Sequence, residues 1–251
     1  MDIKHNIGVV SVSFRKHTPE EILKAMKASG LSLIEWGSDV HAPYNDTERL
    51  TTLSEMQKKY NISCSSYGTY FKLGITPIEE LPKYIDAAKI LGTRILRLWC
   101  GNKSGANMSD QEKTALIEQC KQAAQIAEKM DAVLCMECHR NTLTERLCDT
   151  LELMKAVDSP NFRMYWQPFQ WLQTHDNVEL AKAISPYTEH IHVFNWRDTE
   201  RLPLRDGIEA WREYMKQFDE PRTLLLEFMP DDLIKTLPAE AEALKIIANL
   251  I

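Results

Sequence analysis

The sequence lacks any apolar run long enough to cross a membrane, since its longest runs reach only about eight residues against the roughly 20 that a membrane helix needs. It also lacks a block of basic residues, because Lys and Arg are scattered along a chain of net charge -6. Such a chain has no positive field for a phosphate backbone. We therefore expect neither a membrane span nor a nucleic-acid partner.

Two further absences concern the cellular compartment. The N-terminus lacks the signal-peptide order of basic head, apolar core and small-residue cleavage site. The six cysteines do not form a disulfide framework in a chain of 251 residues, and several lie in apolar positions where free cysteine commonly sits. Cys135 and Cys138 form a C-x-x-C string, but their odd spacing on a strand points the thiols to opposite faces. These features favour a reducing, cytoplasmic location.

No Pro/Gly/Ser-rich linker divides the chain, and strand-like apolar runs alternate with helical periodicity throughout. The runs begin near residues 6, 31, 62, 93, 132, 162, 188 and 222. Helices are expected at 18–29, 46–60, 78–91, 109–130, 145–157, 177–185, 207–218 and 238–250. Each interval leaves room for a crossover helix, which makes the sheet parallel. Eight such units predict one α/β domain over residues 1–251, a single (β/α)8 TIM barrel.

An open, doubly wound sheet is the alternative fold. Its dinucleotide-binding members carry glycines in the first strand-to-helix turn. The corresponding turn here, residues 14–18, contains no glycine. The sequence therefore favours the closed barrel and gives no sign of a nucleotide cofactor.

Two glutamates lie inside otherwise apolar strands: Glu137 in residues 132–139 and Glu227 in residues 223–229. A buried carboxylate is costly unless it is paired, hydrogen-bonded or bound to a cation. A single strand glutamate is commonly paired with an arginine, and Arg97 could be that partner. Two glutamates in one domain instead indicate a metal site or acid-base chemistry.

Strand parity brings further polar residues to the same place. In a barrel, alternate residues point inward and the active site lies at the carboxyl ends of the strands. Glu137, Gln167, His192 and Glu227 all lie late in four consecutive strands, with inward parity. Two carboxylates, an imidazole and an amide oxygen suit Mn²⁺, Co²⁺, Mg²⁺ or Zn²⁺ better than a soft metal. The sequence therefore predicts a divalent metal site.

Several segments resemble the xylose isomerase-like barrel superfamily, and more narrowly its sugar phosphate isomerase/epimerase branch. The resemblance covers nearly the whole chain and rests on residues 33–43, 91–101, 136–144, 190–193 and 225–227. That branch includes ketose 3-epimerases, inosose dehydratases and isomerases, and endonuclease IV. The resemblance implies carbohydrate metabolism and an enzyme acting on a sugar or cyclitol.

In the epimerases, Glu, Asp, His and Glu from consecutive strands hold one metal, and the two glutamates exchange protons with the substrate. The resemblance assigns Glu137, Gln167, His192 and Glu227 to these positions, with Glu137 and Glu227 as the catalytic pair. The chain departs from the family where it reads Gln167-Pro168-Phe169-Gln170 in place of Asp-x-x-His. An amide oxygen brings no charge, so we expect weaker metal binding.

The same departures exclude endonuclease IV, whose zinc cluster needs that Asp and His and an Asp-x-His after the seventh strand. This chain reads Asn195-Trp196-Arg197 there. Three reactions of a carbonyl compound then remain open. After a glutamate removes the proton beside the carbonyl, a proton returned to the other face gives epimerisation, one returned to the neighbouring carbon gives isomerisation, and loss of a hydroxyl gives dehydration.

Isomerisation or epimerisation is the leading interpretation, and dehydration is the first alternative. A barrel that binds a sugar without turning it over is a second alternative, suggested by the two glutamines. The chain is expected to be an enzyme because two glutamates and a histidine at matching depth are more typical of a site than of a core.

Further inward residues are candidates for substrate binding through ion pairs, hydrogen bonds or ring stacking. They are Glu35, His41, Arg97, Trp99, His139, Gln170 and Arg197. Arg97 could instead form an ion pair with Glu35 or Glu137. The residues after the last strand, Phe-Met-Pro-Asp-Asp, would repel a phosphate, which favours an unphosphorylated substrate. Dimers or tetramers are common in the family that the chain resembles, so a homo-oligomer is a further expectation.

Overall fold

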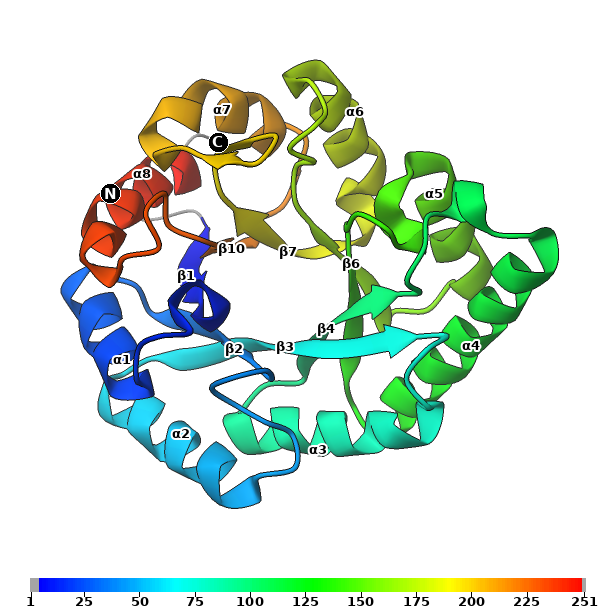
Figure 1. The fold of residues 1–251 in the computed structure, drawn as a ribbon, viewed down its shortest axis with the longest axis horizontal. Coiled ribbons are helices and arrows are strands. Elements are labelled where there is room, and N and C mark those ends of the chain that lie inside the picture. The colour runs from blue at the N-terminus through cyan, green and yellow to red at the C-terminus, as the bar shows by residue number, and fades with distance from the viewer. Residues whose placement is uncertain (1–4, 250–251) are drawn as a thin grey trace.

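Strand β1 (Asn6–Val10) pairs with both β2 and β10, so the parallel sheet closes on itself and leaves no free edge. The computed structural model describes residues 5–249, and within them eight strands form the barrel in the order β1-β10-β7-β6-β5-β4-β3-β2. A ring of helices surrounds these strands (Figure 1). The other barrel strands are β2 (Leu33–Gly37), β3 (Ser63–Leu73), β4 (Ile95–Cys100), β5 (Val133–Glu137), β6 (Phe162–Trp166), β7 (Thr188–Val193) and β10 (Thr223–Leu226). The predicted TIM barrel is confirmed.

The helices begin and end close to the residues that the sequence predicts. They are α1 (Pro19–Ala28), α2 (Thr47–Lys59), α3 (Leu81–Leu91), α4 (Asp110–Lys129), α5 (Leu147–Val157), α6 (Thr174–Ile184), α7 (Ile208–Met215) and α8 (Leu237–Ala248). Thr18 and Ser109 cap α1 and α4 through reciprocal hydrogen bonds with a glutamate three residues later. Helix α6 begins three residues before the predicted 177. No helix in the described part of the chain is both long and apolar enough to cross a membrane.

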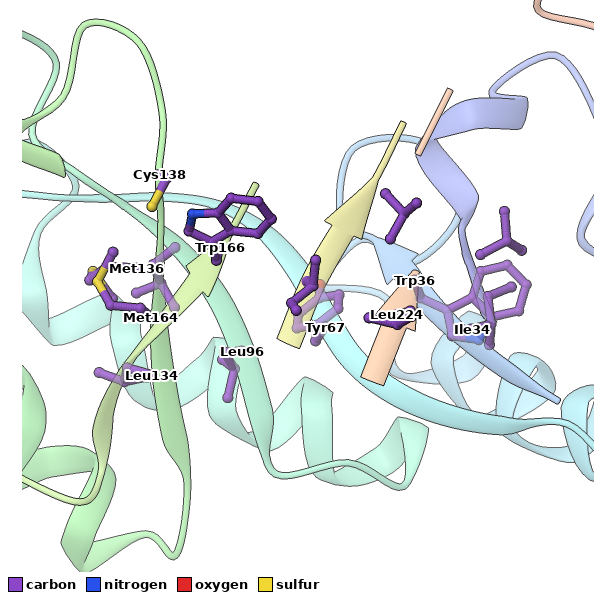
Figure 2. Close-up of a cluster of buried hydrophobic side chains, with 14 of the residues drawn as sticks. Ile34, Trp36, Tyr67, Leu96, Leu134, Met136, Cys138, Met164, Trp166 and Leu224 are labelled. Atoms are coloured by element: carbon purple, nitrogen blue, oxygen red, sulfur yellow. The ribbon is translucent and has the colours of Figure 1, made fainter. Parts of the chain in front are cut away.

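Residues alternate between two cores along every strand. Outward-facing side chains pack beneath the helices, and Figure 2 shows some of them, including Leu96, Met136 and Trp166. Inward-facing side chains fill the barrel with a smaller apolar cluster: Val10, Val12, Val133, Cys135, Tyr165 and Leu225. Cys135 belongs to the inner cluster and Cys138 to the outer one, so the predicted parity of the C-x-x-C string is confirmed.

The structure adds a short hairpin that sequence patterns do not indicate. Strands β8 (Trp196–Arg197) and β9 (Glu200–Arg201) pair in antiparallel fashion between β7 and α7. Asp198 takes a left-handed backbone conformation at its turn, with φ of 54°. The hairpin follows the carboxyl end of β7, the end of the barrel at which TIM-barrel active sites lie.

Candidate active site

His192 on β7 occupies the centre of a polar cluster just beyond the inner apolar core. Its Nδ1 lies 3.2 Å from Gln167 Oε1, 3.4 Å from Glu137 Oε1 and 3.5 Å from Glu227 Oε2. Glu137 ends β5, Gln167 follows β6 and Glu227 follows β10, so four neighbouring strands supply one residue each. Ligand atoms of Glu137, His192 and Glu227 lie within 4.8 Å of one another. The structure thus brings together all four residues that the sequence assigns to the metal.

Glu137 is held firmly by hydrogen bonds from one side. Its Oε2 accepts from Arg97 Nη1 at 2.9 Å and from Trp99 Nε1 at 2.5 Å. Burial raises its pKa, but the Arg97 guanidinium and His192 outweigh burial and hold the pKa of Glu137 well below its usual range. This carboxyl group therefore stays ionised and fixed in position.

Glu227 has no such clamp. Its contact within the cluster is the 3.5 Å approach to His192. Burial, together with the neighbouring negative charge of Glu137, raises the pKa of Glu227 despite the attraction of His192. The two glutamates therefore lie in unlike environments.

Glu35 lies beneath His192 and is fully buried. Its Oε2 accepts hydrogen bonds from Tyr165 Oη at 2.6 Å and Ser66 Oγ at 2.9 Å, and it lies 3.5 Å from His192 Nε2. Its Oε1 accepts from Arg97 Nε at 3.2 Å. Although burial opposes it, the charges of His192 and Arg97 lower the pKa of Glu35 to about 2.

Gly68 on β3 provides the space for the Glu35 carboxylate. A Cβ at this position would lie 2.4 Å from Glu35 Oε1 and 3.1 Å from Arg97 Nη2. Such distances are well inside van der Waals contact. The ion pair between Glu35 and Arg97 therefore depends on the absence of a side chain here.

The charges of the cluster fit a divalent cation. Three carboxylates, Glu35, Glu137 and Glu227, face one guanidinium, Arg97, which leaves two negative charges when His192 is neutral. Without a metal these carboxylates, with Glu227 and Glu35 foremost, raise the pKa of His192 to about 10 against the effect of its burial. The imidazolium thus supplies part of the positive charge that the cluster requires.

The orientation of the side chains fits a metal as well. Gln167 Nε2 donates to the Cys138 carbonyl at 2.9 Å, so its Oε1 faces His192 Nδ1. If His192 Nδ1 coordinates a cation, Nε2 carries the proton and faces Glu35. Metal-binding histidines usually have such a carboxylate partner for their second ring nitrogen. The donor set of two carboxylates, one imidazole and one amide suits a hard or borderline divalent ion.

A cavity of about 290 Å³ opens onto this cluster. Its lining combines aromatic walls with groups of both charges: Val12, Arg15, Tyr70, Arg97, Trp99, Glu137, His139, Gln167, Gln170, Phe194, Trp196, Glu227 and Phe228. His139 Nδ1 lies 2.7 Å from the Arg140 carbonyl oxygen, which can only accept a hydrogen bond. The neutral ring therefore carries its proton on Nδ1 and a free lone pair on Nε2.

The seven residues predicted to bind substrate separate into two groups. Arg97, Trp99, His139 and Gln170 line the cavity. Glu35 lies below it, under His192. His41 is buried elsewhere, with Nε2 3.1 Å from the His17 carbonyl oxygen. Arg197 is exposed on the hairpin and borders an adjoining cavity of about 350 Å³, which shares Gln170, Phe194 and Trp196 with the first.

Two polar residues of the cavity wall escape the strand-parity argument. Arg15 lies in the loop between β1 and α1, donating to Asp39 Oδ2 and to Tyr70 Oη, each at 2.5 Å. Tyr70 lies on β3 between Gly68 and Lys72, where the register with β4 shifts. The rule that strand-to-helix loops build barrel active sites is the signal that could have found Arg15.

Comparison with known proteins identifies the family. Residues 23–248 match the model of the xylose isomerase-like TIM barrel family, and the chain belongs to that family. It is 24% identical over 209 residues to a 3-dehydroshikimate dehydratase of Bacillus anthracis, covering 80% of this chain and 74% of the relative.

Solved structures share the fold over nearly the full chain. A structure described as a probable 3-DHS dehydratase, AsbF, from Bacillus anthracis has a TM-score of 0.81 at 20% identity, covering 95% of this chain and 98% of the other. A D-psicose 3-epimerase with D-tagatose from Clostridium cellulolyticum H10 has a TM-score of 0.67 at 13% identity, covering 95% and 96%. The relatives therefore include a dehydratase and an epimerase, and the chain is an enzyme-type barrel of this superfamily with a candidate metal site.

Proposed function

We propose that this protein is a metal-dependent dehydratase that removes water from a small hydroxylated carbonyl acid. The observation that carries the proposal is the unlike pair of groups available for proton transfer. Glu137 is held by Arg97 and Trp99, whereas His139, with its proton fixed on Nδ1, and Glu227 border the cavity without such a clamp. An imidazole and a carboxyl group suit elimination better than two equivalent glutamates would.

Glu137, Gln167, His192 and Glu227 would hold the metal, as their geometry and charge fit. When bound, a divalent cation polarises the carbonyl of the substrate and stabilises the negative charge that develops on its oxygen. Arg97 keeps Glu137 in place, and Glu35 fixes the ring of His192 from below. We expect any of Mn²⁺, Co²⁺, Mg²⁺ or Zn²⁺ to bind, weakly for this family because Gln167 has no charge.

The proton transfers follow from the residues that border the cavity. His139 Nε2 takes the proton from the carbon beside the carbonyl, and the electron pair of that C–H bond forms the new carbon-carbon double bond. The bond from the next carbon to its hydroxyl breaks, and Glu227, protonated on the oxygen that would not bind the metal, donates that proton to the departing oxygen, which leaves as water. Exchange of protons with solvent then returns His139 and Glu227 to their starting states.

Epimerisation of a ketose is the second candidate, favoured by the structural likeness to D-psicose 3-epimerase. It requires a proton-transfer group on each face of the substrate. Glu137 would have to serve on one face, but Arg97 and Trp99 both donate to the same oxygen of this carboxylate. Its low pKa makes it a weak base.

The test is turnover by the purified full chain after dialysis against a chelator and reloading with each of the four metals. The substrates are 3-dehydroshikimate for dehydration and D-tagatose for epimerisation. Mass spectrometry measures the loss of water, and chromatography measures the sugar composition. We expect metal-dependent loss of water from 3-dehydroshikimate and a loss of about 10²-fold or more in His139→Gln. Turnover of D-tagatose alone would replace the proposal with epimerisation, and absence of both reactions and of metal binding would favour a non-catalytic binding barrel.

A further inference from the structure

A second cavity, of about 200 Å³, lies directly beside the reaction cavity. It is enclosed by the loop after β1, the end of β9 and the residues after β10: Val12, Ser13, Phe14, Arg15, Lys16, His17, Arg201, Phe228 and Asp232. Val12, Arg15 and Phe228 also line the reaction cavity. The two spaces are therefore neighbours that share three lining residues, so a substrate bound in the first has its far end close to the second.

The lining of this second cavity, termed here the basic pocket, carries more positive than negative charge. Arg15, Lys16 and Arg201 are cations, whereas Asp232 borders the cavity as the partner of Arg201 and Asp39 pairs with Arg15 from outside the lining. A cavity with low-dielectric walls concentrates such a potential. The basic pocket is thus suited to an anion, in contrast to the reaction cavity, where Arg15 and Arg97 are matched by Glu137 and Glu227.

Arg201 is oriented before any ligand binds. Its guanidinium lies 4.5 Å from the ring centre of Phe228 and 4.9 Å from that of Trp196. It also contacts Asp232, and its side chain is only 26% exposed. A guanidinium already held by aromatic rings and a carboxylate loses little freedom when it binds a further anion.

Arg15 connects the two cavities. Three hydrogen bonds, to Asp39, Tyr70 and the Val12 carbonyl, engage its guanidinium. A guanidinium has five N–H donors, so two more are available for a ligand. Arg15 can therefore hold a substrate group at the boundary between the cavities while Asp39 and Tyr70 keep it in place.

The surroundings favour a carboxylate over a phosphate. Phosphates are commonly held by backbone N–H groups at a helix N-terminus, but Thr18 and Glu21 already cap the start of α1, next to the pocket. The Glu21 carboxylate would also repel a doubly charged group. Side-chain guanidinium groups remain, and these match the planar geometry of a carboxylate.

We propose that the basic pocket binds the carboxylate of the substrate while the carbonyl end lies in the reaction cavity, with Arg201 and Arg15 as the recognition residues. The placement of the carbonyl end in the reaction cavity rests on the proposed dehydratase function. It assigns substrate specificity to the β1–α1 loop and the β8–β9 hairpin. The enzyme then selects acids over neutral sugars.

Isothermal titration of the metal-loaded full chain tests the proposal with 3-dehydroshikimate, its methyl ester, D-tagatose and inorganic phosphate. We expect the acid to bind at least about tenfold more tightly than the ester, as loss of charge-assisted hydrogen bonds predicts. Arg201→Gln should weaken binding of the acid by about the same factor and leave binding of the ester unchanged. Lys16→Gln should also weaken binding of the acid, but by a smaller factor. Arg212→Gln, an exposed residue of α7 paired with Glu209, is the matched control and should bind like the parent chain.

Equal affinity for acid and ester, or equal weakening of both by Arg201→Gln, would overturn the proposal. Phosphate that displaces the acid at lower concentration would overturn the choice of carboxylate. Turnover without discrimination between acid and ester would refute the basic pocket and leave the dehydratase intact. Discrimination without turnover would support the pocket and refute the reaction, while failure of the acid to bind would refute both.

Discussion

The Glu137 side of the site and the Glu227 side contain the same carboxyl chemistry in opposite states. From β2 to β5, Glu35 and Glu137 share one guanidinium and also accept from Tyr165, Ser66 and Trp99. From β6 to β10, Glu227 approaches the ring of His192 without a guanidinium or indole donor bound to it, and Gln167 brings no charge. The first side thus supplies a guanidinium and several hydrogen-bond donors to its two carboxylates, and the second side supplies neither to Glu227.

This difference separates two uses of buried charge. A buried carboxylate held by a cation and by hydrogen-bond donors contributes rigidity, and removing it takes a buried anion away from that cation. A buried carboxylate without a cation of its own remains available to a metal or a proton. The site thus places its fixed charges and its reactive charges on different strands.

The largest effects are expected from two single variants, one with glutamine in place of Glu227 and one with glutamine in place of Glu137. Glu227→Gln should lower kcat by about 10²- to 10⁴-fold, the range for loss of a proton-transfer group, with little change in thermal stability. Glu137→Gln should instead reduce the free energy of unfolding by about 3 kcal/mol, because Arg97 loses a buried anion. Steady-state kinetics and denaturant unfolding of both variants measure this, and equal stability losses would contradict the comparison.

An intermediate effect is expected from Glu35→Gln, which keeps the shape of the side chain beneath His192. The neutral amide cannot stabilise a proton on His192 Nε2 as a carboxylate does, so metal affinity should fall by about 10- to 100-fold, the usual cost of losing such a partner. Titration with Co²⁺, followed by visible absorption, reports the ligand geometry independently of turnover. Glu35→Asp serves as the control, and an unchanged Co²⁺ affinity in Glu35→Gln would show that Glu35 only stabilises the fold.

The smallest effect should come from Gln167→Asp, which adds charge to the open side. The variant should bind divalent metal about tenfold more tightly, since one more anion faces the cation. Competition with a fluorescent chelator measures the affinity. Gln170 borders the cavity but is not a proposed ligand, so Gln170→Asp is the control. Metal affinity unchanged by Gln167→Asp would remove this residue from the site.

Much of this architecture can be predicted from the sequence because it depends on periodicity. The alternation of apolar runs predicts each barrel strand to within about two residues of its observed start. Parity on these strands brings Glu137, Gln167, His192 and Glu227 together without any contact information. These properties follow from a repeat of two residues along a strand, which a single sequence contains.

Depth and loop structure could not be predicted in the same way. Glu35 has the inward parity expected of a substrate-binding residue, but it lies one layer lower, where Tyr165 and Ser66 enclose it. The β8–β9 hairpin has no periodic signal because each of its strands has two residues. The position of Arg201 depends on stacking against Phe228, a contact between distant parts of the chain.

Gly68 shows that part of the site is made of space that the chain leaves vacant. A glycine within a strand often marks a bulge, and Gly68 does border the register shift between β3 and β4. That shift does not account for the 2.4 Å that would separate a Cβ from Glu35 Oε1. Even alanine, the mildest replacement, would therefore displace a carboxylate that lies beneath the cavity and does not line it. Damage to catalysis can thus begin at a position that carries no chemistry and that an inventory of functional side chains would omit.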